Sequence, residues 1–287
     1  MINARVIIFG SDGMLGRYLT KWLGEKYNII TLTRVEFDVL NYVGMNITRD
    51  LETFLERYQL DENTVIINCI GLIPQTSILD DLNYIYINSI FPSKLADICN
   101  KNNCKLIHPT TDCVYNGESG YPYTEDSVKN ENNIYGLSKC LGENINATVI
   151  RTSIIGEQLK HGYSLLEVVK SKRDGGMDGY VNHYWNGITC LQYSKIVDIM
   201  IEHDIFWKGV RHIYSPKGVS KYELVELINK YYNLNILINP ICVGDNDINK
   251  TLSTKYEYHD EYQLHDLNKY IPTIEKQIEE LVRFNIK

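Results

Sequence analysis

The sequence predicts an α/β protein built on a doubly wound parallel sheet, with a smaller α/β region at its C-terminal end. In the first half of the 287-residue chain, short β-branched runs alternate with longer amphipathic segments, the rhythm of parallel strands joined by crossover helices. A glycine-rich turn joins the first run to the first amphipathic segment. Beyond Gly156 the pattern loosens into glycine-rich and polar stretches. We therefore expect the sheet within residues 1–155.

Each strand of the predicted sheet is a short run rich in Val and Ile. The predicted strands are residues 5–9, 29–32, 65–69, 105–108 and 147–150. Apolar residues recur at helical spacing from Met14 to Leu23, after the first strand, and from Ile87 to Ile98, after the third. Both segments predict helices with one apolar face set against the sheet.

The second half predicts loops and scattered helices. Residues 174–180 and 182–187 are rich in glycine and polar side chains, which is typical of loops. Helical periodicity returns at residues 193–200 and 274–282, and residues 220–223 have the form of a capping box that starts another helix. We expect residues 156–287 to form mainly a second, substrate-binding domain. Within them, the segment of about 190–215 is the candidate to pack with the first domain instead.

Composition and charge exclude several classes of protein. The 29 basic and 36 acidic residues give a net charge of −7 without a block of like charges, so nucleic acid is not an expected partner. No stretch approaches 18 apolar residues, and the Met1 end lacks the cationic segment of a secretion signal, so we expect neither a membrane span nor export. The seven cysteines are scattered without C-x-x-C, which argues against disulfides and a metal site and favours the cytoplasm.

A glycine turn lies between the first strand and the first helix, where a dinucleotide-binding Rossmann domain holds its cofactor. Glycine there permits a tight turn and lets backbone N–H groups approach a pyrophosphate, which the helix N-terminus stabilises. The strand, turn and helix context favours this interpretation over an ordinary turn. The predicted cofactor contacts of the turn are Gly10, Asp12, Gly13, Met14, Leu15 and Gly16.

The end of the second strand bears on which dinucleotide binds. An NAD-specific protein is expected to place an acidic residue there for the ribose 2′-hydroxyl, whereas this strand ends in Arg34. Arg34, with Arg17 on the first helix, can pair with a 2′-phosphate because a guanidinium matches phosphate bidentately. We expect NADPH. NADH stays open, because Glu36 or Asp38 can serve the hydroxyl and both arginines can be solvated surface residues.

Tyr135 and Lys139 lie one helical turn apart, hence on the same face. A lysine cation beside a phenol favours the phenolate and is expected to lower the pKa of Tyr135 from about 10 toward the working range. Such a tyrosine can give a proton to a ketone oxygen while a nicotinamide delivers hydride to carbon. Thr111 follows the fourth strand, where ligands collect in open α/β sheets, and can bind the same oxygen.

Together these segments resemble an extended short-chain dehydrogenase/reductase, closest to the dTDP-4-dehydrorhamnose reductase family. The resemblance is strong over about the first 155 residues, and beyond them residues 163–189 are similar to reductases of surface-polysaccharide pathways. It implies a nucleotide-linked (dTDP or UDP) 4-keto-6-deoxy sugar as substrate, reduced at its C4 ketone. The segments that carry it are residues 10–16, 65–71, 88, 110–115, 135–139 and 151–153.

The resemblance also implies roles for individual residues. Thr111, Tyr135 and Lys139 would be the catalytic set, and Lys139 would also hold the nicotinamide ribose. The further contacts that we expect are Cys69, Ile70, Gly71 and Asn88 for the cofactor, and Asp112 for the substrate. Lys250 lies where related reductases have an arginine-containing wall near the diphosphate, although the full pattern is missing. A homodimer is left open.

Cys113 raises the question of a second reaction. Sugar-nucleotide dehydratases are similar here but read Thr-Asp-Glu, so their base is missing; the dehydrorhamnose reductases usually have Tyr at this point. GDP-fucose synthase has Cys there and uses it with a His to epimerise carbons next to the ketone. A thiol of pKa about 8.5 needs only a modest depression to act as this base, with His161 or His183 as the acid and C3 or C5 as the epimerised carbon. Alternatively, Cys113 is a small buried hydrophobe.

Three residues of the second half are candidate contacts for the sugar or the base. Asn182, Trp185 and Asn186 can line the sugar, and an indole face can stack on a base. A loop folded back on the core is the alternative. At the level of function, the alternative to a reductase of rhamnose-type L-sugar biosynthesis is a non-catalytic NADP-binding subunit that resembles the regulatory subunit of methionine adenosyltransferase.

Overall fold

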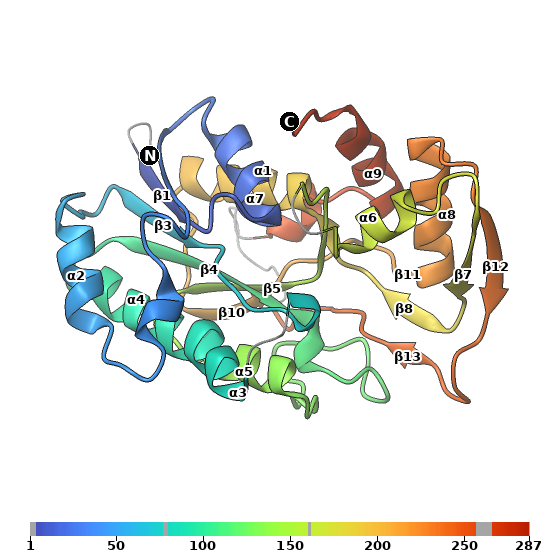
Figure 1. The fold of residues 1–287 in the computed structure, drawn as a ribbon, viewed down its shortest axis with the longest axis horizontal. Helices are drawn as coiled ribbons and strands as arrows, with labels where there is room; N and C mark the ends of the chain where they lie inside the picture. Colours follow the sequence, from blue (N-terminus) through green and yellow to red (C-terminus); the bar gives the residue numbers. More distant parts are fainter. Residues whose placement is uncertain (1–3, 77–79, 160–161, 257–265, 287) are drawn as a thin grey trace.

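A six-stranded parallel sheet organises the computed structural model, which describes residues 4–76, 80–159, 162–256 and 266–286 (Figure 1). The strand order is β10-β5-β4-β3-β1-β2, and all neighbours are parallel. The strands are β1 (Arg5–Phe9), β2 (Asn28–Leu32), β3 (Thr64–Asn68), β4 (Lys105–Thr111), β5 (Thr148–Thr152) and β10 (Gly209–His212). The predicted α/β class and doubly wound sheet are therefore confirmed, and β4 runs to Thr111 because its last two residues pair with Arg151 and Thr152.

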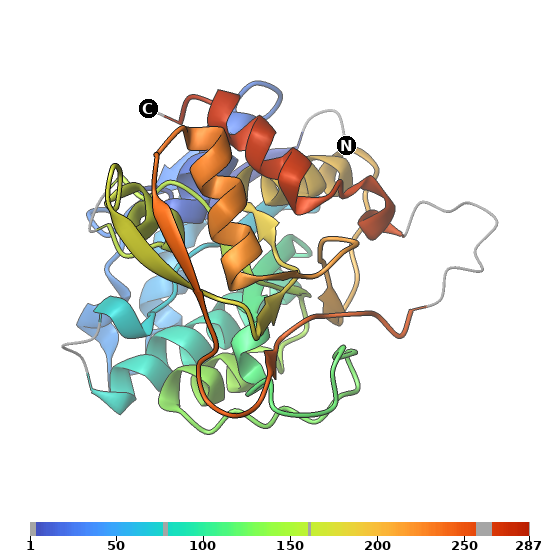
Figure 2. The same ribbon diagram turned by 90° about the vertical axis from the view of Figure 1, so that its right-hand side faces the viewer.

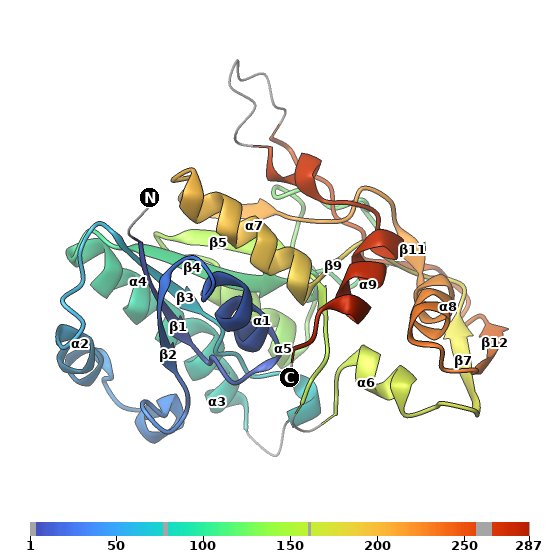
Figure 3. The ribbon, with the colours of Figure 1, turned by 90° about the horizontal axis from the view of Figure 1, so that it is seen from above.

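Helices cover both faces of this sheet (Figures 1 and 3). Successive side chains of a strand point to opposite faces, so Val6 and Ile8 pack in one apolar layer while Ile7 and Phe9 pack in the other. The first layer holds α1 (Met14–Leu23) and α7 (Cys190–Glu202), and the second holds α2 (Thr48–Glu56), α4 (Phe91–Lys101) and α5 (Ile134–Gly142). The connecting elements are η1 (Val39–Tyr42), η2 (Pro74–Thr76), α3 (Asp81–Ile85), η3 (Tyr86–Ile90) and η4 (Asp112–Val114).

The order of strands places a switch point between β1 and β3, where the chain leaves in opposite directions across the sheet. Ligands of open α/β sheets bind outside the carboxyl ends of strands at such a point. The glycine turn follows β1 and residues 69–71 follow β3. An ideal Cβ on Gly10 would lie 3.1 Å from the Cys69 carbonyl, so the two segments are in contact.

Residues beyond β5 build a smaller region from short sheets (Figure 2). Its strands are β6 (Ile154–Ile155), β7 (Gly176–Tyr180), β8 (His183–Trp185), β9 (Ile188–Thr189), β11 (Val219–Ser220), β12 (Leu237–Ile241) and β13 (Ile248–Asn249). Its helices are α6 (Leu165–Lys170), α8 (Lys221–Tyr232), η5 (Leu267–Tyr270) and α9 (Ile274–Arg283). Ser220 and Glu223 form the predicted capping box of α8.

The prediction of loops at residues 174–180 and 182–187 is wrong, because β7 and β8 occupy most of them. β7 pairs with β12 about 60 residues later, and β8 pairs with β11 and β13. Partners so distant along the chain leave no local pattern, and strands this short show no alternation.

Residues 190–212 lie against the large sheet. The α7 helix packs on α1, and β10 extends the sheet beside β5. Asp198 of α7 fastens this contact by accepting hydrogen bonds from Trp22 Nε1 at 3.0 Å and from the Tyr27 hydroxyl at 2.9 Å. Within the described part of the chain, none of the helices combines the length and the apolar character that crossing a bilayer requires.

Candidate active site

The glycine turn forms an open cradle at the start of α1. Gly10 has φ +72°, and its N–H donates to Leu32 O at 2.8 Å, which turns the chain sharply after β1. A methyl group on Gly16 would overlap the carbonyl oxygen of Gly10, so only glycine permits this close approach. Gly13 is the N-cap of α1, and no side chain caps the helix. The first-turn N–H groups can therefore meet a pyrophosphate.

After β2, Arg34 is exposed, whereas the carboxylates of Glu36 and Asp38 accept hydrogen bonds from neighbouring residues. Glu36 accepts hydrogen bonds from Thr33 N at 2.7 Å and Thr33 Oγ1 at 2.6 Å. Asp38 accepts from Leu40 N at 3.0 Å and lies 4.0 Å from Arg34 Nε. Arg34 is exposed, with 73% of its side-chain surface accessible, which leaves the guanidinium able to meet a phosphate.

The segment after β3 lies between the glycine turn and α5. Asn88 is fully buried; its Oδ1 accepts from Leu72 N at 2.9 Å, and its Nδ2 donates to Ser138 Oγ of α5 at 3.0 Å. An ideal Cβ on Gly71 would lie 2.8 Å from Lys139 Nζ, so this ammonium faces the glycine. Cys69 and Ile70 precede it, with Ile70 N donating to Asn68 Oδ1 at 3.1 Å.

Thr111, Tyr135 and Lys139 come together where β4 ends and α5 begins. Asn133 caps α5 by accepting from Gly136 N at 2.9 Å, which places Tyr135 in the first turn and Lys139 one turn later. The hydroxyl of Tyr135 faces that of Thr111, which acts to lower the pKa of Tyr135, while Thr111 Oγ1 donates to Asp112 Oδ1 at 3.2 Å. Burial lowers the pKa of Lys139 to about 8, although the nearby Glu143 carboxylate opposes this shift.

The expectation that Lys139 lowers the pKa of Tyr135 is wrong. Burial raises the pKa of Tyr135 because it disfavours the charged phenolate, and the neighbouring groups of Cys113 and Asp112 act in the same direction. The Thr111 hydroxyl opposes the shift without reversing it. At neutral pH the phenol therefore keeps its proton.

Cys113 lies in surroundings that disfavour a thiolate. Its Sγ lies 3.6 Å from Asp112 Oδ1, and its backbone N–H donates to Thr111 Oγ1 at 3.1 Å. Burial and the Asp112 carboxylate raise the pKa of Cys113 to about 12, with Lys250 opposing them. A catalytic base would need a modestly lowered thiol pKa, whereas the pKa of Cys113 is raised.

The predicted sugar contacts of the second half have different surroundings. Asn182 Nδ2 donates to Val243 O and Asn246 O, each at 3.1 Å, and Asn186 exchanges hydrogen bonds with the backbone of Leu252. Both amides thus pin loops, as expected for a loop folded back on the core. His161 lies outside the residues that the structure describes.

Trp185, Lys250 and Lys221 form a group next to Asp112. Trp185 is buried, and Lys221 Nζ lies 5.3 Å from the centre of its ring. Lys250 Nζ lies 3.6 Å from Glu131 Oε2. The positive charges of Lys250 and Lys221 both act on the buried Asp112 carboxylate. Lys221 was not predicted from the sequence; the signal that could have found it is a cation in the first turn of a helix, where the helix dipole disfavours one.

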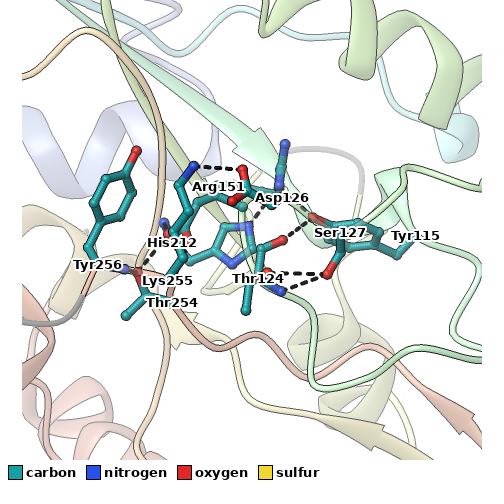
Figure 4. Close-up of polar contacts among 10 residues, drawn as sticks. Tyr115, Thr124, Asp126, Ser127, Arg151, His212, Thr254, Lys255 and Tyr256 are labelled. Carbon is teal, nitrogen blue, oxygen red and sulfur yellow. Dashed lines mark hydrogen bonds and ion pairs between the residues drawn. The ribbon is translucent and has the colours of Figure 1, made fainter.

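A second group that the sequence did not predict is the buried network around Arg151, of which Figure 4 shows Arg151, Tyr115 and His212. Arg151 has no exposed surface, and its guanidinium donates to Glu143 Oε1 at 2.8 Å, to Glu143 Oε2 at 2.6 Å and to the Tyr115 hydroxyl at 2.6 Å. His212 Nε2 accepts from Arg151 Nη1 at 2.8 Å, and Nδ1 donates to Ser253 O at 2.6 Å. The network joins the C-terminal end of α5 to β5, β10 and the chain after β13.

Comparison with known proteins finds a match between residues 4–175 and the family model of the RmlD substrate binding domain. The dTDP-4-keto-6-deoxy-D-glucose reductase of Streptomyces niveus is 27% identical over 234 residues, 78% of this chain and 77% of that protein. Methionine adenosyltransferase 2 subunit beta of Xenopus tropicalis is 25% identical over 255 residues, 80% of this chain and 72% of that protein. Two dTDP-4-dehydrorhamnose reductases are matched over about half of their length.

Among solved structures, the dTDP-4-dehydrorhamnose reductase of Bacillus anthracis, determined in complex with NADP, has the same fold. It superposes with a TM-score of 0.77 and 21% identity, over 97% of this chain and 98% of that one.

Proposed function

Because this chain belongs to the family of the RmlD substrate binding domain, we propose that it is an NADPH-dependent reductase of a nucleotide-linked 4-keto-6-deoxy sugar. The nucleotide is dTDP or UDP, and the reaction converts the C4 ketone to an alcohol. The observation that carries the proposal is the placing of the Tyr135 hydroxyl beside that of Thr111, with Lys139 one helical turn after Tyr135. The named activity of the Streptomyces niveus relative supports the same substrate class.

The glycine turn and the side chains around it fit a dinucleotide. Gly10, Gly16 and the uncapped start of α1 would hold the pyrophosphate. The exposed Arg34 would meet the 2′-phosphate, which supports NADPH over NADH. Lys139, whose ammonium faces Gly71, would hold the ribose. The bound cofactor supplies the hydride for the sugar carbon.

The protein's own part in the reaction is to hold the ketone and deliver a proton. The hydroxyls of Thr111 and Tyr135 face each other, so both can donate to the same carbonyl oxygen once the Thr111 hydroxyl turns away from Asp112 Oδ1. As that oxygen gains negative charge, Tyr135 transfers its proton to it. The raised pKa of Tyr135 suits this direction of reaction because the phenol is protonated before the substrate binds. The Thr111 hydroxyl, which lowers the pKa of Tyr135, would stabilise the phenolate that remains.

The surroundings of Cys113 favour plain reduction over a preceding epimerisation. Removing a proton from the carbon beside the ketone needs a thiolate, and the pKa of Cys113 is raised to about 12. At neutral pH almost none of the thiol would be ionised. We therefore propose that Cys113 borders the substrate without acting as a base.

The test follows NADPH oxidation with dTDP- and UDP-linked 4-keto-6-deoxy sugars and an N-acetylated analogue, in D₂O. We expect turnover by the wild-type protein and a loss of about 10² to 10⁴-fold in the Tyr135→Phe variant. We expect no deuterium at C3 or C5 of the product, and turnover that survives Cys113→Ala. Deuterium that disappears in Cys113→Ala would instead establish epimerisation.

A second candidate function is a non-catalytic NADP-binding subunit. It is favoured by the alignment with methionine adenosyltransferase 2 subunit beta, which spans 80% of this chain. A protein that binds NADPH yet reduces none of these ketosugars would support this candidate. Co-purification with a catalytic partner whose activity changes on binding would then identify the role.

A further inference from the structure

Lys221 and Lys250 follow the two strands, β11 and β13, that flank β8 in the small sheet. Ser220 of β11 and Asn249 of β13 both pair with Tyr184 of β8. Lys221 and Lys250 follow these two residues directly. The fold thus brings together two ammonium groups that lie 29 positions apart in the sequence.

Lys221 faces the end of β4. Its ammonium lies over the Trp185 ring, 5.3 Å from the ring centre. Its charge also acts on Asp112 and Cys113, the two residues that follow Thr111. Lys221 therefore lies on the substrate side of the proposed catalytic group.

The position of Lys221 is unfavourable for a cation in the protein alone. It is the first residue of α8, where the helix dipole favours negative charge. Lys250 adds a second positive charge, and burial lowers the pKa of Lys221. Among the residues that the structure describes, no carboxylate lies within 4.0 Å of its ammonium, whereas Lys250 has Glu131 at 3.6 Å. Local rules are broken in this way mainly at functional sites.

We propose that Lys221 determines substrate specificity by binding a phosphoryl oxygen of the substrate's nucleoside diphosphate. The inference rests on the proposed function, since it assigns Lys221 to the same site. Trp185 provides an apolar face beside the cation, and a charged oxygen forms a stronger hydrogen bond with the ammonium than a neutral oxygen does. Asp112, whose buried carboxylate is affected by the charges of both lysines, would discriminate against a second anion at the same place.

The experiment measures dissociation constants by calorimetry for NADPH, UDP and dTDP, with wild-type protein and three variants. Lys221→Gln removes the charge and keeps the length, and Lys221→Arg keeps the charge. Lys217→Gln removes an exposed lysine four residues earlier and is the matched control. We expect Lys221→Gln to raise the dissociation constants of UDP and dTDP by about tenfold or more. The affinity for NADPH should stay unchanged. Lys221→Arg and Lys217→Gln should stay close to wild type.

The thermal midpoint separates a binding role from a structural one. A residue held for stability would lower the midpoint when it is replaced, whereas Lys221→Gln should leave it unchanged or raise it. A loss of UDP and dTDP affinity in Lys221→Gln, with NADPH affinity unchanged, assigns the oxyanion to the diphosphate. Equal affinities in Lys221→Gln and wild type would overturn this inference alone. A wild-type protein that binds none of the three nucleotides would overturn the proposed function as well.

Discussion

Burial sets the protonation states of Tyr135 and Lys139 at the proposed reaction centre. It raises the pKa of Tyr135 and lowers the pKa of Lys139 to about 8, since in both cases the neutral form is favoured in a medium that solvates charge poorly. Tyr135 is therefore a proton donor throughout the neutral range. Lys139 is a cation at pH 7 that loses its charge at mildly alkaline pH.

The affinity for NADPH is expected to fall as pH rises through about 8. Below the pKa that Lys139 has in the free protein, this side chain is charged and can hold the ribose. Above that pKa, Lys139 must take up a proton when NADPH binds, which weakens binding. The dissociation constant of NADPH, measured by fluorescence at several pH values between 7 and 9.5, checks this prediction. Lys139→Met should bind weakly at every pH and show a flat profile. A wild-type affinity that stays constant to pH 9.5 would contradict the assignment.

Two helix starts position the proposed site: the β1–α1 turn lies close to where a phosphate would bind, and the start of α5 positions the phenol of Tyr135. The turn from β1 into α1 combines the positive φ of Gly10 with the contact between Gly16 and the Gly10 carbonyl. On the other side of the sheet, Asn133 starts α5 directly before Tyr135. Helix starts thus supply both the anion cradle and the proton donor.

Replacing Gly16 by Ala should abolish NADPH binding. The added methyl group would overlap the Gly10 carbonyl oxygen, so the turn must open, with a loss of stability of about 1 to 3 kcal/mol. Gly176→Ala is the matched control, because its methyl group would meet Leu237 O at an ordinary 3.5 Å. Calorimetric binding and urea unfolding of both variants provide the measurement. Normal NADPH affinity in Gly16→Ala would show that the turn does not hold the cofactor.

At the scale of the whole molecule, buried polar groups tie the large sheet to the C-terminal region. Arg151 of β5 binds Glu143 at the end of α5, and His212 of β10 binds Arg151 on one side and Ser253 on the other. Burial lowers the pKa of His212 to about 4, so the ring is neutral and can accept from one partner while it donates to the other. Glu125 adds hydrogen bonds from the His212 N–H and from Thr254 Oγ1, each 2.8 Å long.

The free energy of unfolding should decrease as pH falls from about 6.5 to 4.5. The unfolded chain binds protons on its histidines near pH 6.5, whereas the folded-state pKa values of His212 and of the buried His108 are lowered to about 4 and about 3. Each such histidine contributes a slope of at most about 1.4 kcal/mol per pH unit. Urea unfolding at pH 7.5, 6 and 5 measures it.

His212→Gln should reduce that slope, and His203→Gln, at an exposed position of the same region, should not. The prediction fails if the three proteins show the same dependence on pH. A reduced slope confined to His212→Gln would identify the Arg151 network as an acid-sensitive connection between the two parts of the molecule.

Much of the fold was predictable because its information is local. Five of the six strands of the parallel sheet contain a short apolar run, whereas β10 reads Gly-Val-Arg-His and was not predicted. The helix starts at Gly13, Asn133 and Ser220 carry their own turn or capping residues. The spacing of Tyr135 and Lys139 is a property of any helix. The sequence by itself therefore determined the α/β architecture, the glycine turn and the order of the catalytic candidates along the chain.

Only the tertiary structure decided which groups meet across long separations and how strongly they are desolvated. The strands β7 and β8 exist because partners more than 30 residues away complete their hydrogen bonds. The sign of the Tyr135 shift, the raised pKa of Cys113 and the isolation of Lys221 all depend on what the fold packs around them. Desolvation is a sum over neighbours from many segments, and residue spacing along the chain does not encode that sum.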